Sequence, residues 1–209
     1  MRRKQNLDSR LESCANLLVA EPEKKRGFWL SEYEYNDLFI ELGCGKGRFT
    51  VDTAKTKPDT LFVALEKISN VLVMAMERTY REELQNIRYI NKLADDLTSF
   101  FSYGEVSRIY INFCDPWPSR RHEKRRLTGQ KFLALYKQIL RPNGDIHFKT
   151  DNLLLFEYSL NEFEKNGFLL SDVSYDLHKD KNTGIMTDYE KKFHDTGMPI
   201  YRCVALNRQ

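Results

Sequence analysis

Short apolar runs recur along the chain, each bounded by polar or glycine-containing segments, at intervals that suit buried β-strands. The pattern predicts strands at residues 37–42, 61–65, 87–90, 106–113, 144–150, 172–177 and 201–206. The last two are expected to pair as an antiparallel hairpin.

The segments between the strands carry apolar residues at helical spacing. We expect helices at residues 48–55, 71–83, 132–140 and 153–165, and a turn at residues 141–144, which read Arg-Pro-Asn-Gly. Strands and helices that alternate in this way predict an α/β fold, with a doubly wound, mostly parallel sheet of seven strands and helices on both faces. Residues 1–30 are predicted to be a basic, partly helical extension, and residues 31–209 a single domain.

The composition is that of a globular protein. The chain has 209 residues, of which 41% are hydrophobic and 12% aromatic, and this argues against global disorder. Its four cysteines are far apart and form no CxxC pair, so neither a zinc site nor a disulfide framework is indicated. Neither a secretory signal nor a run long enough to cross a membrane is visible. We expect a cytoplasmic protein that needs no metal.

A glycine-rich turn follows the first predicted strand. Glu41 is followed by Gly43, Gly45 and Gly47, and glycine lets a ligand lie close to the backbone. The helix behind the turn directs its first amides to the same place. Glu66 ends the next strand, where a carboxylate can accept both ribose hydroxyls of NAD or of an adenosyl cofactor. Glu41 favours a cofactor with an ammonium or sulfonium centre, because a carboxylate repels a pyrophosphate.

A second candidate segment follows the fourth predicted strand. Asp115, Pro116, Trp117 and Pro118 stand at its end, and the carboxyl ends of parallel strands meet in one crevice. The two prolines stiffen the loop, and Trp117 offers an aromatic face on which a base can stack. The alternative interpretation is a rigid turn in which Trp117 only fills the core.

A dense basic string comes directly after this loop. The net charge of +3 is too small to indicate a nucleic-acid partner, but the distribution of charge is informative. The cations of the string are Arg120, Arg121, Lys124, Arg125 and Arg126, and a second basic cluster opens the chain at Arg2, Arg3 and Lys4. Such a density usually marks a solvated helix face. Its place behind a candidate active-site loop favours phosphate contact instead.

These segments together resemble a known family, the bacterial tRNA (guanine-N7)-methyltransferases, a branch of the class I, Rossmann-like methyltransferases. The similar stretches are ELGCGKGRF at residues 41–49, NFCDPWPSRRHEKRRLT at 112–128, HFKTDN at 147–152 and MTDYEKKF at 186–193. The second stretch is long and specific. They extend over most of the chain from the first predicted strand onward.

The resemblance implies S-adenosylmethionine as methyl donor, S-adenosylhomocysteine as product, and a guanine in the variable loop of tRNA as acceptor. It implies that Asp115 is the catalytic residue. With the glycine turn, the expected cofactor contacts are Glu41, Gly43, Gly45, Gly47, Glu66, Leu93, Ala94 and Asp115. The expected RNA and substrate contacts are Ser119, Arg121, His122, Glu123, Lys124, Arg125, Arg126, Asp151, Thr187, Asp188, Tyr189 and Glu190.

The chain departs from the family pattern at two positions. Leu93 stands where the family usually has an acidic residue or asparagine against the adenine, so the backbone at Leu93 and Ala94, or the side chain of Asn91 or Asp95, is expected to take that contact. Ser119 stands where a lysine is common, and Arg120 is the candidate replacement.

Three other functions fit parts of the sequence. They are a methyltransferase for an exocyclic amine, an NAD-dependent oxidoreductase, and a non-catalytic RNA-binding protein on a methyltransferase scaffold. The basic string speaks against the first, and Glu41 with Asp115 against the second. We expect tRNA as partner, no membrane association, no obligatory protein partner, and a monomer or homodimer.

Overall fold

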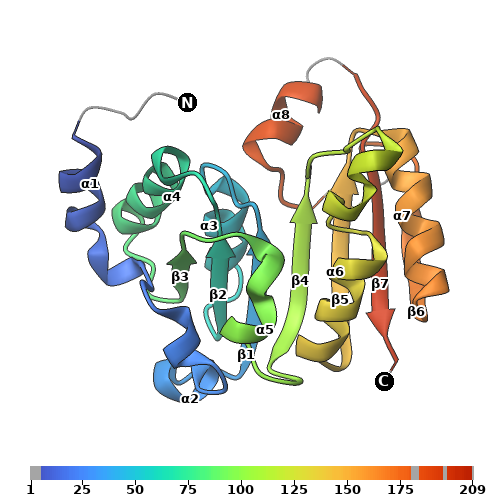
Figure 1. Ribbon diagram of the computed structural model, residues 1–209. Coiled ribbons are helices and arrows are strands. Elements are labelled where there is room, and N and C mark those ends of the chain that lie inside the picture. Colours follow the sequence, from blue (N-terminus) through green and yellow to red (C-terminus); the bar gives the residue numbers. More distant parts are fainter. Residues whose placement is uncertain (1–5, 180–183, 195–196, 209) are drawn as a thin grey trace.

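A seven-stranded sheet forms the centre of the molecule (Figure 1). The computed structural model describes residues 6–179, 184–194 and 197–208. The strand order is β3-β2-β1-β4-β5-β7-β6; β1 to β5 are parallel, and β7 runs antiparallel between β5 and β6. The strands are β1 (Asp37–Leu42), β2 (Thr60–Leu65), β3 (Ile87–Ile90), β4 (Val106–Asn112), β5 (Leu140–Thr150), β6 (Phe168–Ser174) and β7 (Tyr201–Asn207). The predicted fold class and the antiparallel C-terminal pair are confirmed.

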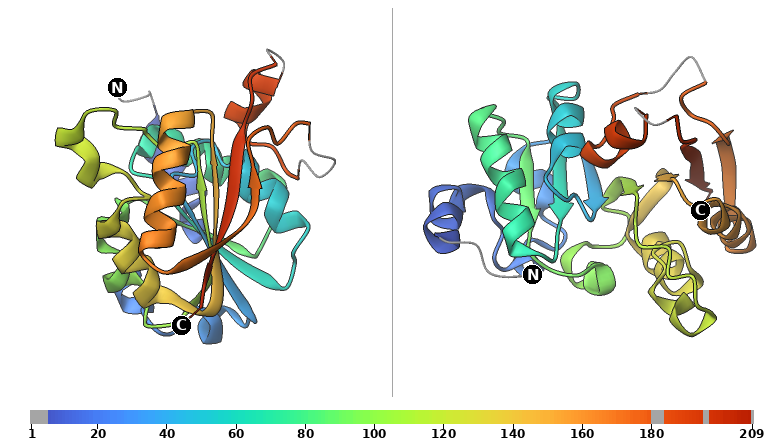
Figure 2. Two further views of the ribbon diagram at one scale, coloured as in Figure 1. Left: turned by 90° about the vertical axis from the view of Figure 1, so that its right-hand side faces the viewer. Right: turned by 90° about the horizontal axis from the view of Figure 1, so that it is seen from above.

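Helices cover both faces of the sheet (Figure 2). They are α1 (Leu7–Ser13), α2 (Trp29–Tyr33), α3 (Arg48–Lys55), α4 (Ser69–Arg81), α5 (Leu97–Phe100), α6 (Gln130–Ile139), α7 (Leu153–Lys165) and α8 (Asp188–His194). Side chains of α3 and α4 pack on one face, and those of α5, α6 and α7 on the other. The inner strands are apolar on both faces because both are covered. Within the described residues, no helix combines the length and apolar character that a membrane crossing requires.

The N-terminal segment packs against the edge of the sheet at β3. Arg10 of α1 forms a two-point ion pair with Glu77 of α4, at 2.6 and 2.7 Å. Leu18 pairs with Tyr89 of β3 as an isolated parallel bridge. The indole of Trp29 is fully buried and donates a hydrogen bond to the carbonyl of Phe100 at 2.8 Å. The predicted boundary at residue 30 stays a prediction, and the basic cluster Arg2, Arg3 and Lys4 lies outside the described residues.

Two strands differ from their predicted bounds by more than one residue. β5 begins at Leu140 and contains the predicted turn as a bulge: the register jumps between Val106 and Arg108 of β4, and Asn143 has φ 60°. β6 covers Phe168–Ser174 rather than 172–177, because Gly167, with φ 75°, ends the preceding helix at once. The alternating residues 172–177 misled the prediction, since a second irregularity at Asp172, with φ 49°, shifts the face that each side chain takes.

The glycine turn shows why three glycines follow β1. Gly43, Gly45 and Gly47 all have positive φ, of 80°, 57° and 76°. At Gly43 and Gly45 a side chain would enter open space, whereas a Cβ on Gly47 would lie 2.5 Å from the Cβ of Ala75 in α4. Gly47 therefore permits both the turn and the close packing of α3 on α4.

We predict that Gly47→Ala destabilises the protein more than Gly45→Ala does. Both changes cost about 1–2 kcal/mol for an alanine at positive φ, and Gly47→Ala adds ~1–3 kcal/mol of overpacking against Ala75. In an Ala75→Gly background the cost of Gly47→Ala should fall only in part, because the Cα of residue 75 stays 2.9 Å from the added Cβ. Urea unfolding of the four variants measures this, and equal costs at the two glycines would contradict the packing role.

Candidate functional site

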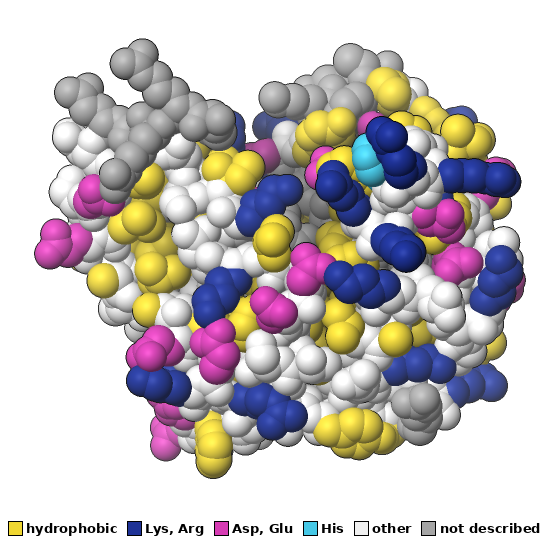
Figure 3. Space-filling view, in the orientation of Figure 1, with side chains coloured by type: hydrophobic (Ala, Val, Ile, Leu, Met, Phe, Trp, Pro, Cys, Tyr) yellow, Lys and Arg dark blue, Asp and Glu magenta, His cyan; other side chains and the backbone are white. Residues whose placement is uncertain are grey.

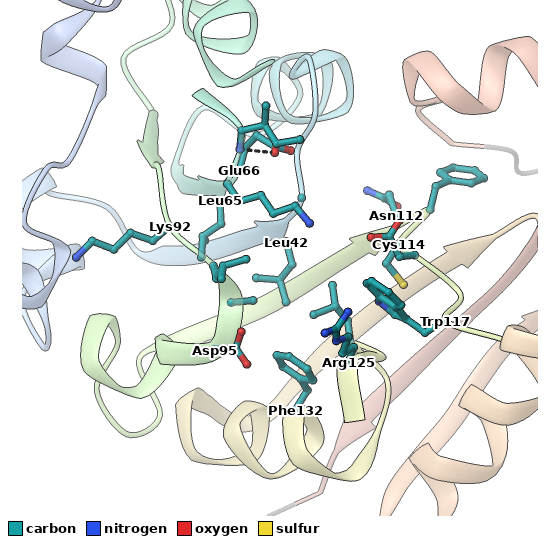
Figure 4. A pocket seen from close by; sticks show the side chains of 18 of the residues that line it. Leu42, Leu65, Glu66, Lys92, Asp95, Asn112, Cys114, Trp117, Arg125 and Phe132 are labelled. Atoms are coloured by element: carbon teal, nitrogen blue, oxygen red, sulfur yellow. Dashed lines mark hydrogen bonds between the residues drawn. The ribbon is translucent and has the colours of Figure 1, made fainter. Parts of the chain in front are cut away.

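A cavity of about 1000 Å³ opens at the carboxyl ends of β1, β2 and β4 (Figure 4). Its walls come from these strand ends, from residues 92–95 after β3, from the loop after β4, and from Lys131 and Phe132 of α6. Parallel strands of an open sheet bind their ligands at this edge. The volume lies at the upper end of the range usual for small-molecule sites, which is roughly 300–1,000 Å³.

Glu66 joins the glycine turn to the floor of the cavity. Its Oε2 accepts a hydrogen bond from the Gly45 N–H at 3.2 Å, and its Oε1 accepts one from the Ile68 N–H at 2.9 Å. The side chain lines the cavity although the residue is only 9% exposed. The hydrogen bonds from these two backbone amides hold the carboxylate in one orientation, and its oxygens keep lone pairs that a polar ligand can use.

Glu41 lies beneath the turn and is not part of the cavity wall. It is buried, and its carboxylate accepts hydrogen bonds from the Thr50 hydroxyl of α3 and, at 3.0 Å, from Nδ2 of Asn112 at the end of β4. Burial raises the pKa of Glu41 to about 7, although the two hydrogen bonds oppose the shift. Any effect of Glu41 on a ligand in the cavity is therefore electrostatic or passes through Asn112, which does line the wall.

Residues 92–95 form the part of the wall that contains Leu93, the position at which the chain departs from the family pattern. Leu93, Ala94 and Asp95 line the cavity, and the Leu93 side chain is 53% exposed. Asn91 is committed elsewhere, since its Nδ2 donates to the carbonyl of Glu66 at 2.7 Å and its Oδ1 accepts from Ser69 at 2.7 Å. The Asp95 carboxylate is paired with Lys131 of α6, so the backbone at Leu93 and Ala94 is the alternative without a side-chain partner to displace.

The loop after β4 carries Asp115 into the cavity. Asp115 is exposed and lines the wall with Phe113 and Trp117. Phe113 has φ 54° and Trp117 has φ 40°, values that residues other than glycine rarely adopt. Such backbone strain tends to occur at functional sites.

The basic string forms the 3₁₀ helix η4 (Arg120–Arg125) and divides into outward and inward side chains. Arg120, Arg121, Lys124 and Arg125 are exposed, and Figure 3 shows lysine and arginine side chains gathered over this part of the surface. Lys124 and Arg125 also line the cavity.

The other members of the string turn toward the loop or away from the cavity. The His122 ring meets the Trp117 indole edge-on at 5.6 Å between centroids. Arg126 donates to backbone carbonyls of the loop. Ser119 and Arg120 are both exposed, and neither lines the cavity.

Thr187 and Glu190 form a capping box at the start of α8. The Glu190 N–H donates to Thr187 Oγ1 at 2.9 Å, and the Thr187 N–H donates to Glu190 Oε2 at 3.3 Å. Glu190 is fully buried, and its Oε2 lies 3.3 Å from Nζ of Lys149 on β5. Burial lowers the pKa of Lys149, and Glu190 opposes that shift. Thr187 and Glu190 therefore shape the start of α8, and Glu190 holds this helix on β5. The predicted contact of Thr187 and Glu190 with substrate stays a prediction.

The two residues between them point elsewhere. Asp188 lies 3.9 Å from Arg48 of α3 and 3.5 Å from Arg78 of α4, so it ties α8 to the opposite half of the sheet. Tyr189 is 46% exposed, and its ring lies 5.1 Å from that of Phe113. Burial, and after it the nearby Asp151 carboxylate, raise the pKa of Tyr189. Tyr189 and Asp151 therefore stand beside the loop that carries Asp115.

Several residues of the site escaped the sequence analysis. Phe132 and Lys131 complete the cavity, and Lys149 holds α8, yet each looks like an ordinary helix or strand residue in the sequence. A signal did exist for α8, because Thr187 followed three residues later by Glu190 is the spacing of a capping box.

Comparisons with known proteins show the family of the chain. A family model described as "Putative methyltransferase" matches residues 35–203. The tRNA (guanine-N(7)-)-methyltransferase of Geobacillus thermodenitrificans is 47% identical, covering 99% of this chain and 96% of that protein. The protein of the same name from Halalkalibacterium halodurans is 49% identical, covering 91% and 87%.

Solved structures share the fold at much lower identity. The 16S rRNA methyltransferase KamB matches with a TM-score of 0.65 at 15% identity, covering 85% of this chain and 92% of that chain. The aminoglycoside resistance methyltransferase NpmB1 matches with a TM-score of 0.63 at 16% identity, covering 90% and 94%. These two likenesses establish the fold alone.

We predict that Glu41 makes the cofactor-free protein less stable as the pH rises. Its folded-state pKa of about 7 lies above the ordinary value of 4.5, so the folded state binds the proton more tightly. The stabilisation is complete below the unfolded-state value and is lost as the pH rises through about 7, which amounts to ~3 kcal/mol. Between pH 5 and pH 8, the free energy of unfolding of Glu41→Gln, measured with urea, should therefore rise relative to that of the wild type by about that amount. A difference that is constant with pH would contradict the assignment.

Proposed function

The chain belongs to the tRNA (guanine-N7-)-methyltransferase family, and from this premise we propose that it transfers a methyl group from S-adenosylmethionine to N7 of a guanine in the variable loop of tRNA. The observation that carries the proposal is the cavity at the carboxyl ends of β1, β2 and β4, where Glu66 and Asp115 share one wall beside a basic surface. A cofactor and a base need such a common chamber, and an RNA needs the cations at its mouth.

The residues around the cavity fit the cofactor. Glu66, held by two amides, would accept from the ribose hydroxyls, and the backbone of Leu93 and Ala94 would meet the adenine. Gly43 lines the cavity and Gly45 faces open space, so both would let the methionine part approach the backbone, whereas Gly47 serves the turn and the packing on α4. The carboxylate of Glu41, bound to Asn112, would attract the positively charged ammonium group. When bound, S-adenosylmethionine supplies an electrophilic methyl group on a sulfonium centre.

The acceptor atom needs no general base, because N7 of guanine already carries an exposed lone pair. The protein's part is to position that atom, and positioning alone can contribute several kcal/mol to catalysis. Asp115, exposed in the cavity wall, would accept hydrogen bonds from the amino edge of the base and offset the positive charge that methylation leaves on the purine. Tyr189, beside Phe113 of the same loop, and Asp151 near it do not line the cavity, and we propose that they hold the base from its rim.

The tRNA would lie over η4. Arg120, Arg121 and Lys124 face solvent and can each neutralise a phosphate, and Arg120 can take the contact that a lysine makes in the family at the position of Ser119. A base in tertiary pairing has to leave its stack to reach Asp115, as with other enzymes that modify bases. A tRNA substrate also supports the expected cytoplasmic location. All the expected contacts come from one chain, which supports action as a monomer or homodimer without a further protein.

Methyl transfer to unmodified tRNA tests the proposal. The purified chain is incubated with labelled S-adenosylmethionine and tRNA transcripts that have or lack a guanine in the variable loop. We expect label only in the former, with strand cleavage at that nucleotide after reduction and aniline treatment, which detect N7-methylguanosine. Label in N6-methyladenine would favour the exocyclic-amine alternative, and no label in any transcript would reject the enzyme assignment.

We predict that Asp115→Ala and Asp115→Asn lose most of the single-turnover methylation rate, by about 100-fold or more, while S-adenosylhomocysteine still binds. The asparagine variant keeps the shape and removes the charge, so it isolates the electrostatic part. Asp59→Asn, an exposed change on the loop before β2, is the control. Calorimetry and rapid-quench assays give the two readouts. An unchanged rate in either Asp115 variant would remove Asp115 from the catalytic role.

A further inference from the structure

We infer that Arg126 is a positioning residue that holds the active-site loop in shape and is not a phosphate contact of the basic string. The inference rests on the proposed function only for its methylation readout. Arg126 and Arg121 belong to the same basic string, and the inference gives them different roles.

The guanidinium of Arg126 is bound to the backbone of the loop. Its Nε lies 3.2 Å from the carbonyl oxygen of Pro116 and 3.3 Å from that of Trp117, and its Nη2 lies 3.0 Å from the Trp117 oxygen. These are hydrogen bonds from a charged donor, which are stronger than neutral ones. The side chain is partly buried, whereas Arg120, Arg121, Lys124 and Arg125 are exposed.

The other face of the same guanidinium rests on α7. Its central carbon lies 4.2 Å from the ring centroid of Tyr158, a distance typical of stacking. Burial, and after it the nearby Glu123 carboxylate of η4, raise the pKa of Tyr158 to about 12. The guanidinium of Arg126 thus lies between the ring and the loop, and its Nε and Nη2 atoms are already hydrogen-bonded to the loop carbonyls.

The loop needs such a support. Trp117 adopts φ 40° although it is not glycine and is followed by Pro118, which further restricts its backbone. A residue held in such a conformation costs on the order of 1–3 kcal/mol and persists only when its surroundings impose it. The two carbonyls that Arg126 binds belong to Trp117 and to Pro116, the residue directly after Asp115. A shift of this backbone would displace the Asp115 carboxylate from the base.

The experiment compares Arg126→Met and Arg126→Lys with Arg121→Met, which removes an exposed cation of η4. Methionine removes the charge, and lysine keeps the charge but loses the forked donor that binds two carbonyls. The wild type and each variant are assayed for tRNA affinity as a function of salt, for single-turnover methylation at saturating tRNA and cofactor, and for tryptophan emission.

We expect both Arg126 variants to lower the single-turnover rate by about 10- to 100-fold, because small misplacements of a catalytic group have effects of that size. The slope of log affinity against log salt should stay that of the wild type for Arg126→Met, and fall by about one for Arg121→Met. The chain has two tryptophans and Trp29 is fully buried, so a change in emission that is absent in a Trp117→Phe background reports the loop.

Tyr158→Leu provides a second route should Arg126→Met fail to fold. This change removes the ring on which Arg126 stacks but leaves every cation in the chain. We expect a lower methylation rate with an unchanged salt slope. The inference is overturned if Arg126→Met lowers the salt slope by about one, or if Arg126→Lys keeps the wild-type rate and emission. The salt slope and the emission need no methyl transfer, so an inactive wild type would reject the proposed function and still leave this inference tested.

Discussion

The buried carboxylate of Glu41 is the contact on which the site depends, because it joins the three elements that surround the crevice. It stands at the end of β1 and binds Thr50 in the first turn of α3 and Asn112 at the end of β4. A buried carboxylate is costly unless it is hydrogen-bonded, so the three elements are held where those bonds can form. The turn above it is fixed in the same manner, since Glu66 binds the Gly45 amide from β2.

Residues that stand together in one motif have different physical tasks in this protein. In the basic string, Arg121 faces solvent while Arg126 binds the backbone of the Asp115 loop and stacks on Tyr158. At the start of α8, Thr187 and Glu190 cap the helix and Glu190 meets Lys149, while Tyr189 between them lies beside Phe113. At α8, helical geometry imposes this division, because neighbouring residues of a helix point in different directions. Arg126 instead follows the end of η4, where its side chain binds the loop.

The strands and helices that build the site could be predicted because their patterns are local. The bounds of β1, β3, α3 and α7 were found as predicted, since each is a continuous apolar or amphipathic run that ends at glycine, charge or a loop. β6 was misplaced because its first residues are read correctly only when the end of α7 at Gly167 and the irregularity at Asp172 are known. Neither bulge in the sheet leaves a signal in the periodicity, since each depends on the partner strand.

The chemistry of the chain is local in the same sense, and the sequence by itself determined it: a glycine turn after a strand, an acidic residue after the next, and Asp115 in a proline-stiffened loop before a run of cations. Contacts between distant segments could be decided only by the tertiary structure. It placed Glu41 beneath the cavity wall, committed Asn91 to the carbonyl of Glu66, and turned Arg126 inward onto Trp117. Periodicity and composition specify which groups are present and which face of an element they share. Burial and hydrogen-bond partners arise only when segments far apart in the chain pack together, and these decide whether a charged group meets a ligand or holds the residues that do.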